Sequence, residues 1–428
     1  MRTTIMSSAK TLLGDTFIYA GANILNAGIP FLLLPVLTRV LSPADYGIVA
    51  MFGIVVSIMG AFTGLSVHGA VGVRYFQLDR ERMPLYVGAC LSILAVSSAV
   101  VLCVVAAGRP WLELITHVPG DWLLVAVLVS SAQFVINIRL SLWQVKHKAI
   151  HYGAFQISQS LLNGGLSLLL VLGLGMAWEG RVLGQAVAVI AFMLVALFLL
   201  LRQAEASRPT TTNDARDALK FGVPLIPHVI GGLLIVTTDR FMITNLLDVA
   251  QAGIYVVALQ MGMVLGLLTD SFNRAYAPYL MGALVKEDPA RDRKIVRGTY
   301  VYFIAVTSAA LALGVAAPEL MSVLVGERFR SAAGAVLYVA MGYAFEGMYY
   351  MVTGYVFFTS KTGYLAGVTF ASGVFNIIAT YILIKVNGVL GAAQAFMLSQ
   401  AMIFLCTWWL AQRFRPMPWR TALFSENT

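Results

Sequence analysis

The sequence consists of long apolar stretches separated by short clusters of charged residues. A helix needs about 20 mostly apolar residues to cross the hydrocarbon core of a bilayer. Twelve stretches reach this length, and we expect membrane-spanning helices near residues 14–40, 47–70, 84–107, 122–143, 152–175, 182–201, 221–246, 252–273, 298–325, 332–357, 363–384 and 389–411. The longest connections, 202–220 and 274–297, are too short to form domains of their own. The pattern therefore predicts an all-α polytopic membrane protein whose helices carry its function.

Composition supports this interpretation and excludes the soluble enzyme folds. Hydrophobic residues make up 59% of the 428 positions and charged residues only 11%, with a mean hydropathy of +0.82. A soluble protein carries about 25% charged residues. The three cysteines have no paired spacing, the five histidines form no zinc motif, and the sequence has no GxxxxGK[ST] loop. We therefore expect no metal, no cofactor, no nucleotide-driven motor and no enzymatic activity.

Lysine and arginine are distributed unevenly between alternate connections. If the N-terminus is cytoplasmic, 22 of the 29 basic residues fall in cytoplasmic segments and six in outer segments, and Arg240 falls inside a span. Positively charged residues are kept on the cytoplasmic side during membrane insertion. We therefore expect both termini to be cytoplasmic. The same asymmetry explains most of the net charge of +9, so no nucleic-acid partner is expected.

Short motifs recur about half the chain apart. The chain reads TRVLSPADYGIVA at 38–50 and TNLLDVAQAGIYVVA at 244–258, an offset of 206. The tripeptide VLG at 182–184 returns at 389–391, an offset of 207. Two halves of six spans, residues 1–206 and 207–428, would enter the membrane with the same orientation, because six is an even number. We expect two parallel six-helix repeats around a central cleft, an arrangement that secondary transporters use for alternating access.

Several of these motifs occur together in a known family. The first span ends in LPVLTRVLSPADYG, the seventh opens with FGVPLIPHVIGGL and continues to TTDRFMITNLL, and AGIY follows. In these motifs, in its length and in its twelve expected spans, the chain resembles the polysaccharide flippase family (Wzx/RfbX-like). That family shares the multidrug/oligosaccharidyl-lipid/polysaccharide exporter (MOP) superfamily with the MATE drug exporters and the lipid II flippases.

The resemblance implies movement of a polyprenyl-pyrophosphate-linked oligosaccharide from the cytoplasmic to the periplasmic leaflet of a bacterial inner membrane. The product would serve exopolysaccharide, capsule or O-antigen synthesis. The partners would be this lipid-linked oligosaccharide and membrane lipids, with a polysaccharide polymerase and assembly proteins as further candidates. One alternative is an ion-coupled small-molecule or multidrug exporter. A second is a lipid II flippase, although such proteins typically have two additional helices. A membrane-embedded polymerase or ligase is disfavoured, because no large periplasmic loop is expected.

The tenth expected span carries a carboxylate at membrane depth. With a rise of about 1.5 Å per residue, Glu346 lies about 20 Å into this span, close to the bilayer midplane. Tyr343 and Tyr350 share its helical face. Intramembrane ionisable residues usually face a bundle interior or a wet cavity. We therefore treat Glu346, Tyr343 and Tyr350 as substrate-binding candidates and Glu346 also as a coupling candidate. The alternative is a protonated glutamate bonded to a neighbouring helix.

Asp239 and Arg240 form a second intramembrane group, in the seventh expected span. Adjacent helical residues point about 100° apart, so the two do not simply neutralise each other. The repeat offset puts Leu33 and Leu34 at the equivalent positions, so the charges are an addition to the second half. A guanidinium is a good ligand for phosphate or carboxylate groups. We treat both residues as substrate-binding candidates, with a structural ion pair between helices as the alternative.

Charged residues near the cytoplasmic ends of two spans are further candidates. Asp270 and Arg274 lie at i, i+4 in the eighth span, where an ion pair within the helix is the simpler interpretation. In the functional interpretation, Arg274 and Arg74, at the matching end of the second span, receive the pyrophosphate. Asp270 is also a coupling candidate.

Amide side chains and prolines complete the prediction. Gln133 and Asn137 lie at i, i+4 in the fourth span and would contact sugar or form hydrogen bonds between helices. Prolines break the backbone ladders of the first and seventh spans, at Pro30, Pro35, Pro224 and Pro227. Irregular backbone at membrane depth is tolerated where it lines a cavity or is buried in protein, so we expect these two spans to line the cleft.

Overall fold

The computed structural model describes residues 21, 25–26, 28–29, 31–207, 212–285, 288–359 and 361–422. Every regular element within these ranges is a helix. The chain divides into two compact units, Met1–Thr237 and Thr238–Thr428, called here the N-terminal and C-terminal units. Much of the first expected span, including Pro30, lies outside the described residues. Its last part is an apolar helix, Phe31–Val40.

The N-terminal unit continues with helices that alternate with short turns. They are α2 (Pro43–Phe62), η1 (Thr63–Ser66), α3 (His68–Arg74), α4 (Met83–Ala107), α5 (Arg109–Thr116), α6 (Gly120–Val145), α7 (Ala149–Leu168), η2 (Leu169–Gly173), α8 (Trp178–Arg202), α9 (Thr212–Gly222) and η3 (Val223–Leu225). Helix α10 (Ile226–Leu246) contains the division at Thr237. The C-terminal unit then contains α11 (Val249–Leu284), α12 (Pro289–Leu324), η4 (Glu327–Ala332), α13 (Ala333–Phe358) and α14 (Thr362–Phe414).

The helices confirm an all-helical polytopic membrane protein. Among the described residues, eight helices are long and apolar enough to cross a membrane, or up to nine if the bent pair Thr212–Leu233 and Val236–Leu246 is one span. Five expected spans between residues 47 and 201 correspond to Pro43–Ser66, Met83–Ala107, Gly120–Val145, Ala149–Gly173 and Trp178–Arg202. The count is lower than twelve partly because α14, with 53 residues, is counted as one helix. In addition, α13 is not among the eight, because its tyrosines, glycines and glutamate lower its mean hydropathy.

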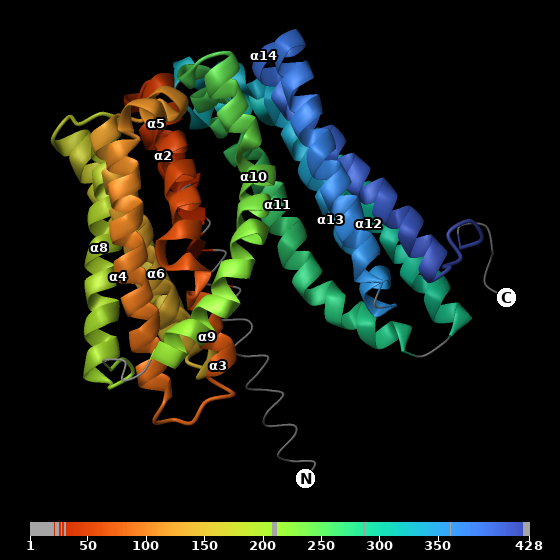
Figure 1. The fold of residues 1–428 in the computed structure, drawn as a ribbon. Helices are drawn as coiled ribbons and strands as arrows, with labels where there is room; N and C mark the ends of the chain where they lie inside the picture. The colour runs from red at the N-terminus through yellow and green to blue at the C-terminus, as the bar shows by residue number, and fades with distance from the viewer. Residues whose placement is uncertain are drawn as a thin grey trace. The chain divides into compact units, whose positions relative to one another are not determined.

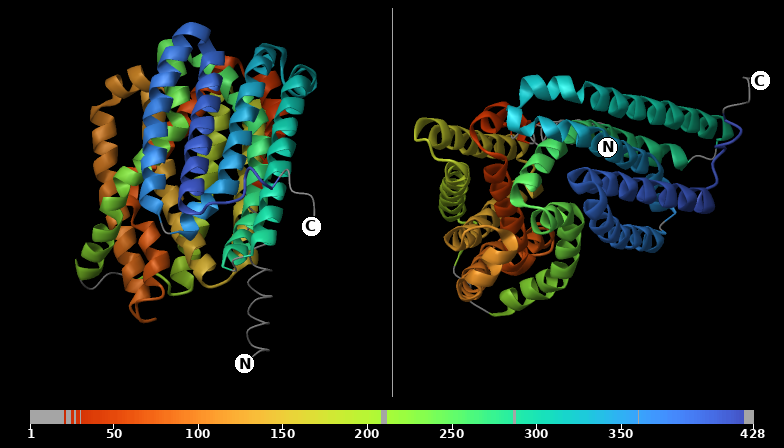
Figure 2. Two further views of the ribbon diagram at one scale, coloured as in Figure 1. Left: turned by 90° about the vertical axis from the view of Figure 1, so that its right-hand side faces the viewer. Right: turned by 90° about the horizontal axis from the view of Figure 1, so that it is seen from above.

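Helix α14 is a helical hairpin. At Gly388 the backbone leaves the helical region, with φ 57° and ψ −137°, a conformation that glycine adopts readily. Beyond the break the chain returns so closely that a Cβ on Gly391 would lie 1.9 Å from the Leu383 carbonyl oxygen. The Asn376 amide donates a hydrogen bond to Ser399 Oγ at 3.0 Å, joining the two arms, which lie side by side in Figure 2. The arms coincide with the expected spans 363–384 and 389–411.

The two recurring segments begin their helices in the same way. Ser42 caps α2 and Asp248 caps α11; each accepts a hydrogen bond from the backbone N–H three residues later, on Asp45 at 3.1 Å and on Gln251 at 2.8 Å. Such caps satisfy backbone donors that a helix leaves unpaired at its first turn. The Asp45 carboxylate also accepts from the Ser42 backbone N–H at 2.8 Å, which completes a capping box. The two caps are separated by the repeat offset of 206.

In the N-terminal unit, α6 is the central helix and packs against α2, α3, α4 and α8. Figure 1 shows α4, α6 and α8 running alongside one another. The apolar core includes Phe52, Val87, Ile136 and Leu200, all fully buried. The chain turns after α2 at Gly64, where φ is +72° and a Cβ would lie 2.2 Å from the Phe134 ring. Only glycine allows this approach of η1 to α6.

Helix α9 closes one end of the N-terminal unit, beside α3 and α4 (Figure 1). The connection 202–220 thus contains a short helix that the apolar pattern did not predict. Its Asp217 carboxylate accepts two hydrogen bonds from Arg74, both at 2.8 Å, and Asp214 pairs with Arg82 at 2.7 Å. At its end, a Cβ on Gly222 would lie 2.3 Å from the Leu65 carbonyl oxygen. Ion pairs and a close backbone contact therefore hold α9 in place.

In the C-terminal unit, α13 packs against α11, α12 and α14. The apolar core includes Val296, Ala344, Val352 and Tyr355. Each of α11 and α12 has 36 residues, about 54 Å at a rise of about 1.5 Å per residue. Both are therefore longer than the bilayer's hydrocarbon core, which is about 30 Å thick. The residues after α14 fold back on the unit, where Arg297 donates to the Ala422 carbonyl at 2.6 Å.

Candidate functional site

Asp239 and Tyr255 connect α10 with α11 inside the C-terminal unit. The fully buried Tyr255 hydroxyl donates a hydrogen bond to Asp239 Oδ2 at 2.7 Å. The other carboxylate oxygen, Oδ1, accepts from the backbone N–H of Arg240 at 2.7 Å. A buried carboxylate needs such donors, because an unsatisfied buried charge is costly. Each oxygen of Asp239 therefore accepts one hydrogen bond.

The guanidinium of Arg240 is weakly held. Its Nε lies 3.9 Å from Asp239 Oδ1, beyond hydrogen-bond distance, and this buried atom has no hydrogen-bond partner in the described part of the chain. The side chain is 28% exposed, against 12% for Asp239. The two groups are thus neighbours without a direct hydrogen bond between their side chains. This geometry leaves donors on Arg240 for an anionic ligand.

The three predicted residues of α13 form a second part of the same group. Tyr350 donates its hydroxyl hydrogen bond to Glu346 Oε1 at 2.9 Å. The ring of Tyr343 lies against α11, where a Cβ on Gly266 would be 2.6 Å from it. Tyr343 also interacts electrostatically with Glu346, Arg240 and Asp239. Tyr343 is therefore close enough to the charges of α10 and to the carboxylate of α13 to interact with both.

Asp270 and Arg274 extend the group along α11. Arg274 Nε lies 2.9 Å from Asp270 Oδ2, and more than a third of each side chain is exposed. This is the ion pair within the helix that the i, i+4 spacing favours. Asp270 also interacts electrostatically with Glu346 and Tyr350. The structure thus brings seven of the predicted residues into one network on α10, α11 and α13, called here the polar cluster: Asp239, Arg240, Asp270, Arg274, Tyr343, Glu346 and Tyr350.

The polar cluster offers chemistry suited to a polar, anionic ligand. Phenol and carboxylate groups can exchange hydrogen bonds with hydroxyls, and aromatic rings can pack on the apolar faces of sugars. Arg240 and Arg274 supply positive charge, and guanidinium groups bind phosphate and carboxylate oxygens in a bidentate manner. Among the residues that the structure describes, no group of histidine, cysteine, aspartate and glutamate side chains could hold a metal ion.

Arg74 belongs to the N-terminal unit and has a different setting. It donates to both oxygens of Asp217, and Tyr86 donates to the same carboxylate at 3.1 Å. The hydrogen bonds to Asp217 raise the pKa of Arg74, so the guanidinium is charged at all physiological pH values. About a quarter of its side chain is exposed. A pyrophosphate would therefore compete with Asp217 for this arginine.

Gln133 and Asn137 are bonded to each other along α6. The Gln133 amide donates to Asn137 Oδ1 at 3.0 Å, and both side chains are half-buried. The remaining donors and acceptors of the two amides are available to a ligand or to a neighbouring helix. The structure places this pair in the N-terminal unit with Arg74, whereas the polar cluster lies in the C-terminal unit.

Two groups of polar residues in the structure were not predicted from the sequence. Tyr255 lies in the AGIY motif and could have been linked to Asp239, because the motif follows TTDR. The second is a polar stripe along α7 at helical spacing, formed by Tyr152, Gln156, Ser160, Asn163 and Ser167. Arg181 of α8 donates to Asn163 Oδ1 at 2.7 Å and to Ser167 Oγ at 2.9 Å, and Ser160 bonds Asn26. The helical spacing of these polar residues could have predicted that they share one face of α7.

Comparison with known proteins agrees with this architecture. The profile of a family described as "Polysaccharide biosynthesis protein" matches residues 12–284. In Haemophilus influenzae, "Lsg locus putative protein 1" is 22% identical over 354 residues, which cover 81% of this chain and 85% of that protein. An "Uncharacterized membrane protein" of the same organism is 22% identical over 359 residues, with coverages of 82% and 85%.

Solved structures share the fold at low sequence identity. The lipid II flippase MurJ, in an inward closed conformation, has a TM-score of 0.71 and 12% identity, covering 94% of this chain and 87% of its own. An inward-facing multidrug resistance MATE family transporter of the MOP superfamily has a TM-score of 0.68 and 12% identity, with coverages of 93% and 94%. The fold therefore defines a multi-pass membrane protein with the architecture of the MOP superfamily. The family match shows that the chain belongs to the polysaccharide biosynthesis protein family, which confirms the resemblance seen in the sequence.

Proposed function

We propose that this protein is a flippase that moves a polyprenyl-pyrophosphate-linked oligosaccharide from the cytoplasmic to the periplasmic leaflet of a bacterial inner membrane. It would do so by alternating access, for the synthesis of exopolysaccharide, capsule or O-antigen. The observation that carries this proposal is the family match over residues 12–284. That match includes α10 and α11, which supply Asp239, Arg240 and Tyr255.

The geometry of the polar cluster supports an anionic glycolipid as substrate. Arg240 Nε is a buried donor with no hydrogen-bond partner in the described part of the chain, although the Asp239 carboxylate lies 3.9 Å away. Nearby phenols of α13 can bond sugar hydroxyls. We infer that Arg240 binds the pyrophosphate or an acidic sugar. Tyr343, Glu346 and Tyr350 would then bind neighbouring hydroxyls, while the polyprenyl chain stays in lipid.

A twelve-span organisation of two parallel repeats is part of this proposal. The hairpin in α14 supports counting it as two spans, and the 26 residues of α13 are long enough to form another. Equivalent glycines support the repeat: a Cβ on Gly184 would lie 2.6 Å from the Ser167 backbone nitrogen, and one on Gly391 would contact Leu383. The repeat boundary near residue 206 and cytoplasmic termini remain predictions.

Loss of the gene tests the function directly. In a strain with no second flippase, deletion should make polyprenyl-linked oligosaccharide accumulate in the cytoplasmic leaflet and should reduce surface polysaccharide. Reintroducing the wild-type gene should reverse both effects. Normal surface polysaccharide in the deletion strain would exclude the proposed function.

An ion-coupled exporter of small molecules is the second candidate. It is favoured by the fold shared with a multidrug transporter and by Glu346, a carboxylate in the middle of α13 that could couple transport to a cation. The same deletion strain distinguishes the two functions. An exporter would leave the surface glycan intact and sensitise the cells to cationic drugs.

A further inference from the structure

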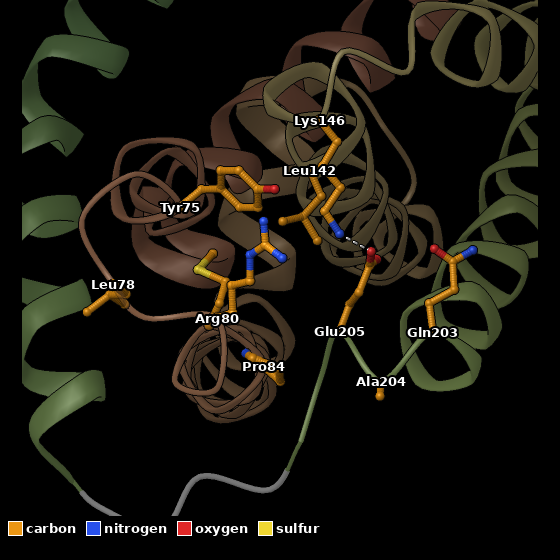
Figure 3. A pocket seen from close by; sticks show the side chains of 10 residues that line it. Tyr75, Leu78, Arg80, Pro84, Leu142, Lys146, Gln203, Ala204 and Glu205 are labelled. Atoms are coloured by element: carbon orange, nitrogen blue, oxygen red, sulfur yellow. Dashed lines mark hydrogen bonds and ion pairs between the residues drawn. The ribbon is translucent and has the colours of Figure 1, made fainter.

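A pocket of about 650 Å³ lies within the N-terminal unit. Its walls come from the turn after α3, the start of α4, the end of α6 and the segment after α8 (Figure 3). The lining residues include Tyr75, Arg80, Leu142, Lys146, Gln203 and Glu205. Since α4, α6 and α8 are candidate spans, the pocket lies where the apolar layer ends. The distribution of basic residues predicts that this is the cytoplasmic edge.

Positive charge exceeds negative charge around this pocket. Glu205 accepts hydrogen bonds from both Arg139 and Lys146. Arg139 is 0% exposed and donates a further hydrogen bond to Gln203 Oε1 at 2.9 Å. Arg80, on the opposite wall, has no ion pair in the described part of the chain. Two cationic side chains therefore share the Glu205 carboxylate, and Arg80 adds a third positive charge at the pocket.

The polar ends of three side chains point into the same space. Figure 3 shows the Arg80 guanidinium and the Tyr75 hydroxyl directed toward the middle of the pocket, and the Lys146 amine directed across it to Glu205. The acidic neighbours of Arg80 in the sequence, Asp79 and Glu81, do not line it. A guanidinium and an ammonium that converge without full neutralisation favour an oxyanion.

We propose that this pocket binds the phosphate group of a lipid at the membrane surface. Arg80 would contact the phosphate oxygens through its free guanidinium, and Lys146 and Tyr75 would donate from the other side. The apolar walls, from Leu78, Leu142 and Met83, suit the first carbons of the attached chain. Basic pockets between spanning helices on the cytoplasmic side bind anionic lipid headgroups. The site does not depend on the transport function proposed above.

A phosphate of this kind has two sources, a bilayer phospholipid or a polyprenyl phosphate carrier. The test uses the full-length protein in neutral detergent and measures bound lipid by native mass spectrometry. The probes are phosphatidylglycerol, polyprenyl phosphate, phosphatidylcholine and inorganic phosphate. The variant is Arg80→Gln, which removes the unpaired cation without disturbing the Glu205 pairs. The control is Arg216→Gln, because Arg216 is exposed on α9 and does not line the pocket.

We expect Arg80→Gln to weaken phosphatidylglycerol binding about tenfold, whereas Arg216→Gln changes it less than twofold and phosphatidylcholine binds weakly to all forms. Tighter binding of polyprenyl phosphate than of phosphatidylglycerol, with the same Arg80 dependence, would support the site and identify the carrier as its source. Equal binding by wild type and Arg80→Gln would overturn the proposal. So would an equal loss in both variants, or displacement of lipid by inorganic phosphate at equal concentration. Surface glycan is not a readout, so failure here is separable from failure of the flippase function.

Discussion

The Tyr255 hydroxyl donates a 2.7 Å hydrogen bond to the Asp239 carboxylate, joining α11 to α10. This contact links the motif TTDR, which contains Asp239, to the motif AGIY, which contains Tyr255, 16 positions later in the chain. The guanidinium of the adjacent Arg240 lies on the other side of this carboxylate, with its Nε 3.9 Å from Asp239 Oδ1. The Thr244 hydroxyl donates to the Arg240 carbonyl at 2.9 Å, and its repeat equivalent Thr38 donates in the same way to Leu34 at 2.7 Å.

Removing the Tyr255 hydroxyl should destabilise the C-terminal unit. Tyr255→Phe keeps the buried ring but leaves Asp239 Oδ2 without its donor, a loss of about 1–3 kcal/mol. We expect a lower apparent melting temperature in detergent. Asp239→Asn removes the buried charge and should make the subsequent loss of the hydroxyl less costly. An unchanged melting temperature for Tyr255→Phe would show that the hydrogen bond does not contribute.

Arg240→Ala should abolish transport, because it removes the cation that we propose binds the substrate. The protein should remain present in the membrane, because the Arg240 guanidinium lies 3.9 Å from Asp239 and makes no hydrogen bond to it. Arg240→Lys should retain part of the transport, since lysine keeps the charge and loses the bidentate geometry. The measurement pairs membrane abundance with surface glycan in the same strains. A well-expressed and fully active Arg240→Ala would contradict the substrate role.

A structural role for Arg240 gives a different result. In that case Arg240→Ala would leave Asp239 without its cation, and the membrane abundance would fall. The double variant Asp239→Asn, Arg240→Ala would then restore both abundance and transport. We expect no such rescue.

Alanine at the two repeat-equivalent glycines should be strongly destabilising. A Cβ would lie 2.6 Å from the Ser167 backbone nitrogen at Gly184 and 1.9 Å from the Leu383 carbonyl oxygen at Gly391. Overpacking of this kind costs about 1–3 kcal/mol or more. Gly165→Ala is the matched control, because that exposed glycine has open space around its Cβ position. We expect lower membrane abundance for the first two variants and wild-type abundance for the third.

The ion pair between Arg74 and Asp217 should stabilise the docking of α9. Both side chains are partly exposed, at 27% and 40%, so their coupling should be about 1 kcal/mol or less. A double-mutant cycle with alanine at each position, read from melting temperatures, should show that the two losses are less than additive. Strict additivity would mean that the pair makes no net contribution. If Arg74 also binds substrate, Arg74→Ala should reduce transport more than Asp217→Ala.

Topology can be tested by fusion reporters. The asymmetry of basic residues predicts cytoplasmic signals from fusions after Lys220 and after Asp288, and a periplasmic signal from a fusion after Arg328. Six spans before Lys220 place both halves in the same orientation. A periplasmic signal after Lys220 would contradict both the span count and the parallel repeat.

The sequence by itself was enough to predict membrane insertion, most helix positions and the family. Apolar length and basic flanks are local properties, because the bilayer acts on each segment separately. The prediction also selected the residues of the polar cluster, since a charge such as Arg240 or Glu346 in an apolar span is conspicuous without any knowledge of its neighbours. The i, i+4 pairs at Asp270 and Gln133 followed from helix geometry alone.

Only the tertiary structure decided which side chains meet. Helix rotation and packing bring Arg74 to Asp217, 143 positions away, and Arg139 to Glu205. They also bring the Tyr343 ring against Gly266 of α11 and form the hairpin of α14 at Gly388. The apolar pattern contains no information on these pairings, because a lipid-facing side and a packed side of a spanning helix are equally apolar. The positions of polar partners on separate helices therefore depend on how the helices pack together.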